Sequence, residues 1–324
     1  MSNAATLGTW DGHDVRLDDV LDALDRLRHT SEKRATRTSV MNLVVVARSE
    51  EETQRACEAT HQFGQRHPTR TVVLQSQSTG EGLDATITAH GITTGAVSVW
   101  SEDIVLTVRG TAGEHLLSLV EPLTLSDLPV ALWYVASLPP PGDALAAACD
   151  AIIVDGKELG DERAFADLRA LQRQRTVVDL SWIRLEPWRQ LLAGLFDGHD
   201  FRPFVTGVRS AEVHGKPGPR HLLGGWLVDR LGLARSAVHL REARHVTLRL
   251  VAEAGGRAGE FVVTRDEGQR LVRASAAIEG GPSHEDVLPL PQMGLGWSLG
   301  QALTDLLPDR TYEHALHAAL GFLR

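Results

Sequence analysis

The chain has 324 residues, of which 43% are hydrophobic and 23% are charged, and its formal net charge is -9 at pH 7. This length and composition predict a globular protein with two domains and sizeable cores. The net negative charge argues against a nucleic-acid-binding protein, which would need a clustered basic surface, and no apolar run approaches the roughly 20 residues that a membrane-spanning helix needs.

Helices and buried strands alternate through the first part of the chain. The pattern from residue 40 to residue 74 predicts a βαβ unit, because an uninterrupted apolar run is typical of a strand covered on both faces. Residues 100–103 are expected to form a tight connection between two short strands. In chain order we predict a helix over 16–28, a loop over 30–39, a strand over 40–47, a helix over 50–64, strands over 71–74, 85–91, 96–100 and 103–109, a helix after Gly110, strands over 130–133 and 152–154, a helix over 161–173 and a strand over 177–178.

Beyond Phe196 the pattern changes to alternating strands rich in Arg and Gly. We predict strands over 205–213, 246–253, 259–264 and 271–277, a helix over 222–231 and a pair of helices over 298–323. The segment Gly198-His199-Asp200 interrupts the helix before it, so a domain boundary is expected near residue 198. The predicted fold is α/β, with a mixed, largely parallel N-terminal sheet and covering helices over 1–197 and a smaller α+β domain over 198–324.

A stretch near the middle of the chain gathers aromatic and basic side chains in a sequence otherwise poor in aromatics. It predicts the end of a buried strand, an N-cap at Ser181 and a helix that opens with Trp182, Arg184, Trp188 and Arg189. Trp and Arg are enriched at protein–protein hot spots, so these four residues are candidate partner-binding residues. The two tryptophans are six positions apart and would fall on different faces of one helix, one in the core and one exposed. A core between the domains that holds both tryptophans is an equally good interpretation.

Residues suited to chemistry are few. His67 and Arg70 lie at the mouth of an apolar strand, where they could contact an anion or a phosphate, although a structural salt bridge explains Arg70 equally well. No His/Cys cluster has the spacing of metal ligands, and no Gly-rich phosphate loop is present, so we predict no metal, no cofactor and no catalytic site. Cys57 and Cys149 lack CxxC spacing and are interpreted as ordinary buried thiols of a cytoplasmic protein without a signal peptide.

Five stretches, taken in order, resemble one known family. They are 41–46 (MNLVVV), 67–70 (HPTR), 116–123 (LLSLVEPL), 127–133 (DLPVALW) and 179–197, which begins DLSW. Together they resemble the OpcA family of glucose-6-phosphate dehydrogenase assembly proteins, and the resemblance runs from about Val15 to the C-terminus. It implies a non-catalytic bacterial protein of the pentose phosphate pathway that binds glucose-6-phosphate dehydrogenase and promotes its active oligomer.

Two functions are therefore predicted. The first is an assembly factor and allosteric activator, which would act by binding the active form of the dehydrogenase better than the inactive form. The alternative is a sugar-phosphate-binding enzyme or sensor, which would use Arg70 and the strand ends of the α/β domain. Neither function requires a nucleic acid or a membrane as partner.

Overall fold

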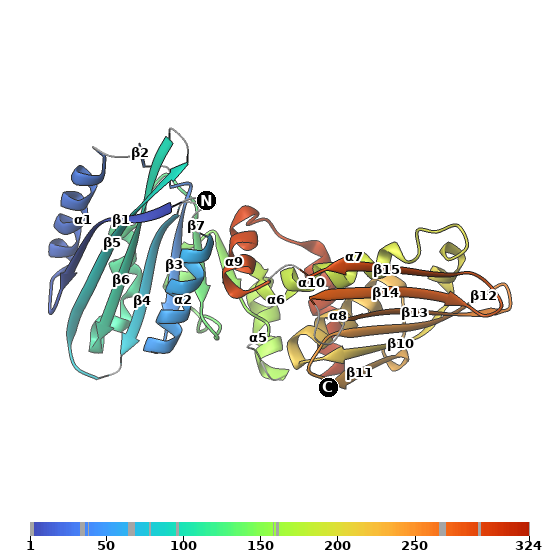
Figure 1. The fold of residues 1–324 in the computed structure, drawn as a ribbon. Helices are drawn as coiled ribbons and strands as arrows, with labels where there is room; N and C mark the ends of the chain where they lie inside the picture. The colour runs from blue at the N-terminus through green and yellow to red at the C-terminus, as the bar shows by residue number, and fades with distance from the viewer. Residues whose placement is uncertain are drawn as a thin grey trace. The chain divides into compact units, whose positions relative to one another are not determined.

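The computed structural model describes residues 3–32, 36–37, 39–63, 69–77, 79–94, 97–157, 159, 162–265, 270–290 and 293–323. The chain forms two compact units, which are considered separately (Figure 1). The first unit comprises Met1–Val154, Arg175–Val178 and Gly294–Leu307, and the second comprises Asp155–Gln174, Asp179–Met293 and Pro308–Arg324.

The first unit is built on a nine-stranded mixed sheet with the order β1-β5-β6-β4-β3-β7-β8-β9, in which β2 pairs with β6. The pairings between β6, β4, β3, β7 and β8 are parallel, whereas β1, β5 and β6 pair antiparallel. The strands are β1 (Asn3–Gly12), β2 (Thr36–Arg37), β3 (Met41–Ala47), β4 (Thr69–Gln77), β5 (Gly82–Thr94), β6 (Val97–Arg109), β7 (Val130–Tyr134), β8 (Ala151–Val154) and β9 (Thr176–Asp179).

Helices cover this sheet. Figure 1 shows α1 beside β1 and β5, and α2 over β3 and β4. The predicted start of α2 is confirmed, because the Ser49 Oγ accepts a hydrogen bond from the Glu52 backbone nitrogen at 3.2 Å. Every residue of β3 is buried, as expected for a continuous apolar run. The helices are α1 (Leu17–Glu32), α2 (Glu50–Phe63), α3 (Leu116–Val120), α4 (Ala144–Ala148) and α9 (Leu295–Thr304), with 3-10 turns at Gly110–Glu114 and Glu121–Leu123.

Two predictions in this unit were wrong. The expected loop over 30–39 instead contains the end of α1, at Glu32, and the strand β2. Residues 100–103 lie inside β6, which is a single strand that pairs along its length with β5. A polar run of this kind is typical of a turn, because a strand interior rarely holds a carboxylate. Here the Glu102 carboxylate is buried and bonded to the Arg70 guanidinium, so the strand continues through it.

The second unit is built on a six-stranded sheet with the order β11-β10-β12-β13-β14-β15, in which all pairings except β10–β11 are antiparallel. Alternate side chains of β12 and β13 are fully buried, including Leu248, Leu250, Phe261 and Val263. The strands are β10 (Val208–Gly215), β11 (Val238–Glu242), β12 (Thr247–Ala254), β13 (Arg257–Arg265), β14 (Leu271–Ile278) and β15 (Ser283–Pro289).

Helices of the second unit pack on this sheet and on one another. The helix α7 contacts β13 and β14, and α8 contacts β10 and α10. The helices α8 and α10 approach closely at Gly225, where a Cβ atom would lie 2.1 Å from the Ala315 carbonyl oxygen. The helices are α5 (Glu162–Gln172), α6 (Leu180–Arg184), α7 (Glu186–Gly194), α8 (Pro217–Leu231) and α10 (Arg310–Ala319), with 3-10 turns at Arg202–Gly207, Arg235–Ala237 and Leu320–Phe322.

The predicted fold class is confirmed, with a mixed, largely parallel sheet followed by a second α+β part. All strands of the first sheet precede residue 198 and all strands of the second follow it. The division into units nevertheless differs from the expected boundary, because the chain first enters the second unit at Asp155. The reason is packing: α5 contacts α10, and α6 contacts α8, so both helices join the second core.

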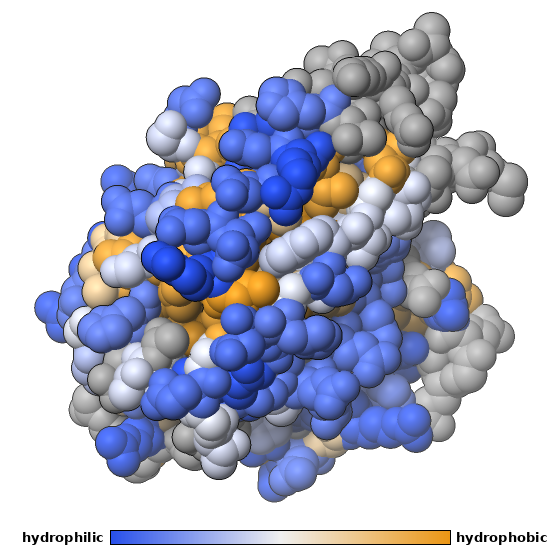
Figure 2. Space-filling view, turned by 90° about the vertical axis from the view of Figure 1, so that its left-hand side faces the viewer, coloured by the Kyte–Doolittle hydropathy of each residue, from blue (hydrophilic) through white to orange (hydrophobic). Residues whose placement is uncertain are grey.

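On the face that Figure 2 shows, the described surface is mostly hydrophilic, with hydrophobic areas between the hydrophilic side chains near the middle of the view. Among described residues, the exposed large hydrophobic side chains are Val40, Val251, Val287, Leu288 and Leu307. None of the described helices combines the length and the apolar character needed to cross a membrane.

Candidate functional site

The stretch over residues 179–197, which holds Trp182, Arg184, Trp188 and Arg189, begins with the buried carboxylate of Asp179. The Asp179 side chain accepts hydrogen bonds from the backbone nitrogens of Ser181 at 2.8 Å and Gly156 at 2.9 Å, and from the Tyr312 hydroxyl at 3.2 Å. Burial raises the pKa of Asp179 to about 6, although the two backbone hydrogen bonds act in the opposite direction. Asp179 is therefore the N-cap of α6, and the prediction of Ser181 as the cap was wrong by two residues.

Trp182 lies in the interior of the second unit with 4% of its surface exposed. Its Nε1 donates a hydrogen bond to Asp309 at 2.7 Å, and its ring lies 5.8 Å from the ring of Tyr312. The Arg189 guanidinium carbon sits 3.5 Å from the centroid of the same ring, and its Nη1 donates to the Trp182 carbonyl oxygen at 2.8 Å. Burial lowers the pKa of Arg189 to about 10. The Trp182–Arg189 pair thus joins α6 to α7 inside the unit.

Trp188 is also buried, with 6% of its surface exposed. The expectation that one tryptophan is exposed is therefore wrong. Both tryptophans belong to the second unit, as do Asp309 and Tyr312, which Trp182 contacts. Arg184 forms an ion pair with Asp155, and 16% of its side chain is exposed. Of the four predicted partner-binding residues, Arg184 and Trp188 line a cavity, whereas Trp182 and Arg189 contact each other.

The cavity has a volume of about 380 Å³ and lies wholly within the second unit. Its buried lining residues are Ser181, Leu185, Trp188 and Leu290. Its basic lining residues are Lys157, Arg184, Arg244, His245, Arg265 and Arg270, and no carboxylate occurs among the described residues that line it. A cavity with this lining is suited to an anion, because guanidinium groups pair readily with phosphate and carboxylate oxygens.

Arg70 is placed in the core of the first unit. Only 2% of its side chain and 1% of the Glu102 side chain are exposed. The Arg70 Nε donates to a Glu102 carboxylate oxygen at 2.7 Å, and Nη1 donates to the Leu123 carbonyl oxygen at 3.1 Å. Of the two interpretations of Arg70, an anion contact and a structural salt bridge, the structure shows the salt bridge, with Glu102 as the partner. His67, the other residue predicted to contact an anion, lies outside the described residues.

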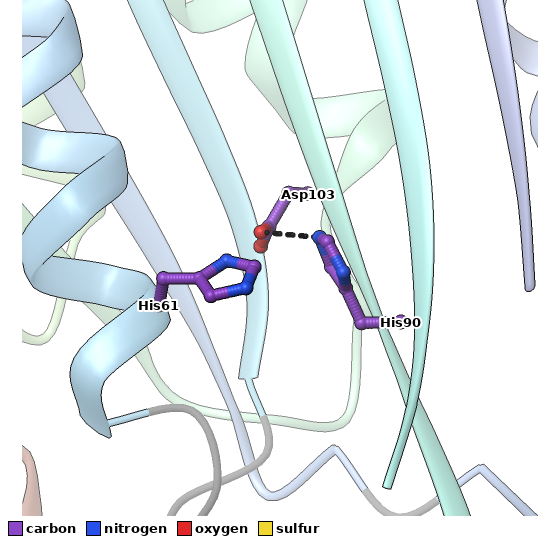
Figure 3. Close-up of side chains that lie close together, drawn as sticks. All are labelled: His61, His90 and Asp103. Carbon is purple, nitrogen blue, oxygen red and sulfur yellow. Dashed lines mark ion pairs between the residues drawn. The ribbon is translucent and has the colours of Figure 1, made fainter. Parts of the chain in front are cut away.

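Two histidines and an aspartate gather at the surface of the first unit. Figure 3 shows the side chains of His61 from α2, His90 from β5 and Asp103 from β6 pointing toward one another. One ligand atom of each lies within 4.8 Å of the others, so these three described residues are close enough together to hold a metal ion. The sequence analysis missed this group because its members come from three separate elements and have no motif spacing.

Neither cysteine forms a disulfide. Cys149 is buried, and burial raises the pKa of its thiol to about 12. Cys57 is half-buried, and burial together with the negative charge of Asp103 raises the pKa of its thiol. Both thiols are therefore protonated at neutral pH, in agreement with their interpretation as ordinary cysteines.

Two family models match most of the chain. A model for the N-terminal domain of a glucose-6-phosphate dehydrogenase subunit matches residues 60–173, and a model for the C-terminal domain of such a subunit matches residues 175–316. The chain belongs to the OpcA family. The two OpcA models meet at residue 174, where the chain also passes between the two units, rather than at the expected boundary near residue 198.

Three curated relatives carry the name OxPP cycle protein OpcA. The chain is 30% identical over 139 residues to the protein of Synechococcus elongatus, a match that covers 39% of this chain and 31% of that protein. The protein of Nostoc punctiforme is 30% identical over 139 residues, covering 39% of this chain and 29% of the relative. The protein of Synechocystis sp. is 29% identical over 138 residues, with the same coverage of 39% and 29%. The match thus spans less than a third of each relative's length.

Proposed function

We propose that this chain binds glucose-6-phosphate dehydrogenase and promotes its active oligomer without catalysing a reaction itself. The observation that carries this proposal is the match of both OpcA family models, each described as a domain of a glucose-6-phosphate dehydrogenase subunit. The oxidative pentose phosphate names of the relatives support the same pathway. We also propose a cytoplasmic location, in which the chain would share a compartment with the dehydrogenase.

The mechanism is a shift in population. A binding protein changes the equilibrium between two oligomeric forms only by the difference between its affinities for them. The buried contacts of Asp179, Trp182 and Arg189 contribute by fixing the shape of the second unit. Of the four candidate partner-binding residues, Arg184 and Trp188 line the cavity, and a partner group that enters the cavity would contact them directly.

A mixing experiment tests this proposal. The chain and the dehydrogenase from the same organism are combined and examined by size-exclusion chromatography with light scattering, beside an assay of dehydrogenase activity. We expect a joint peak whose mass includes the dehydrogenase oligomer, and a rise in activity that saturates with added chain. The chain alone serves as the control and should show no turnover. Separate elution together with unchanged activity contradicts the proposal.

The basic cavity favours a second function, the binding of a sugar phosphate. Four arginines and one lysine line a space of about 380 Å³, which has room for a small phosphorylated metabolite. Arg244 and Arg265 have no ion-pair partner among the described residues, and both are exposed. This function would place the ligand in the second unit rather than beside Arg70, where the sequence analysis expected it.

Calorimetric titration tests the second function. We expect glucose 6-phosphate or 6-phosphogluconate to bind and unphosphorylated glucose not to bind. The double substitution Arg244→Ala/Arg265→Ala should weaken binding about tenfold or more, because a hydrogen bond to a charged group contributes about 1.5–3 kcal/mol. Arg209→Ala is the matched control, since Arg209 lies on β10 outside the cavity lining. Equal affinity of the double variant and the wild type would exclude the cavity as the site.

A further inference from the structure

The group formed by His61, His90 and Asp103 is fixed by the register of two strands and the end of a helix. In the β5–β6 pairing, His90 lies opposite Ser101, and Asp103 is two residues further along β6. Residues two apart share one face of a strand, so His90 and Asp103 are diagonal neighbours on the same face. His61 lies in the last turn of α2 and contacts the His90 ring edge to face, with centroids 4.8 Å apart.

The three side chains are close enough for one ion. The His90 Nε2 and the Asp103 Oδ2 are 3.1 Å apart, and a nitrogen of His61 completes a set whose atoms all lie within 4.8 Å of one another. At metal–ligand distances of about 2.1 Å, neighbouring ligand atoms of a tetrahedral site lie about 3.4 Å apart. Binding of an ion would therefore require the exposed His61 ring to move closer to the other two side chains.

The surroundings of Asp103 favour a metal rather than an ordinary surface ion pair. Neither Lys nor Arg pairs with the Asp103 carboxylate among the described residues, and its partner is the His90 imidazole. The Asp103 carboxylate thus lies beside two imidazoles, and imidazole and carboxylate are groups that bind zinc in proteins.

We propose that His61, His90 and Asp103 bind one divalent transition metal ion, with zinc as the ion that this donor set suits best. Two imidazoles and one carboxylate leave at least one coordination position open to water. The ion would tie the last turn of α2 to β5 and β6, and so stabilise the first unit. The three residues belong to the first unit, whereas the residues that line the basic cavity belong to the second.

Zinc titration of the whole chain tests the site. After removal of metals with a chelator, we expect calorimetry at neutral pH to show one zinc ion bound per chain and the melting temperature of the first unit to rise with zinc. His61→Ala and Asp103→Asn should each lower the zinc affinity on the order of 100-fold, since even partners outside the ligand shell cost 10–100-fold when removed. Cobalt should give the absorption of a low-coordinate site, which both variants lose.

A matched control separates this site from adventitious binding at histidines. His284 and Asp286 form a His–Asp pair 2.9 Å apart, and no third ligand lies with them among the described residues, so His284→Ala should leave zinc binding unchanged. Circular dichroism in the absence of zinc checks that each variant is folded; His61 is exposed and Asp103→Asn is nearly isosteric. A wild-type chain that binds no zinc stoichiometrically would overturn the proposal. So would equal zinc affinity in the wild type and in both folded ligand variants.

Discussion

Replacing Arg70 by methionine is expected to destabilise the first unit by about 3–5 kcal/mol, because the Glu102 carboxylate then stays buried without its cation. The two side chains are 2% and 1% exposed, so water cannot replace the lost partner. The Leu123 carbonyl oxygen also loses a hydrogen bond. Urea unfolding followed by circular dichroism measures the change as a lower midpoint of the first unit's transition.

The double substitution Arg70→Met/Glu102→Leu distinguishes a paired charge from a binding residue. Hydrophobic replacement of both members of a buried ion pair is often neutral or stabilising, so the double variant should recover most of the lost stability. Arg16→Ala removes one member of the exposed Arg16–Asp18 pair of the same unit and should change the unfolding midpoint little. A stable Arg70→Met single variant with altered anion binding would instead restore the interpretation of Arg70 as an anion contact.

Replacing Trp182 by alanine is expected to destabilise the second unit by about 3–5 kcal/mol, the usual cost of removing a buried tryptophan. The change removes the surface on which the Arg189 guanidinium stacks, the contact with Tyr312 and the hydrogen bond to Asp309. Differential scanning calorimetry should show a lower melting temperature for the second unit. Below that temperature, the remaining folded chain should bind the dehydrogenase as the wild type does.

Trp182→Phe is the matched variant. It keeps an aromatic ring beside Arg189 and Tyr312 but loses the Nε1 hydrogen bond to Asp309, so a cost of about 1 kcal/mol is expected. If Trp182 instead anchors the partner, Trp182→Ala would keep the wild-type melting temperature and lose dehydrogenase binding. That result would return the stretch to the partner-contact interpretation and contradict its role in the core.

Apolar periodicity in the sequence predicts the buried elements. It does not predict strands that form only by pairing with a strand distant in the sequence. The uninterrupted run at Met41–Ala47 predicts β3, which is buried along its whole length. The strand β1 was not predicted, because its short, mostly polar residues carry little pattern and its strand form depends on pairing with β5. The strands β11 and β15 were missed for the same reason, since both lie at edges of the second sheet.

The location of the conspicuous stretch follows from sequence, but its role in the structure does not. The prediction assumed one continuous helix, on which tryptophans six residues apart diverge. The helix instead ends at Arg184, and a second begins at Glu186 with Pro187 in its first turn, so both tryptophans turn inward. Contacts between distant elements, such as that of His61 with His90, leave no spacing in the sequence and need the fold to be seen.

The position of α9 in the chain affects the order in which the two units can fold during synthesis. This helix comes from near the end of the chain but packs in the first unit, where Gly296 approaches α2 so closely that a Cβ atom would lie 2.9 Å from the Ala59 carbonyl oxygen. Leu299 and Leu303 of α9 are almost fully buried. During synthesis, the first unit therefore cannot complete its packing until α9 has left the ribosome, and α9 follows all strands of the second sheet in the chain. A chain truncated between the two family domains, at residue 174, would lack α9, and α2 would lose its contact with that helix.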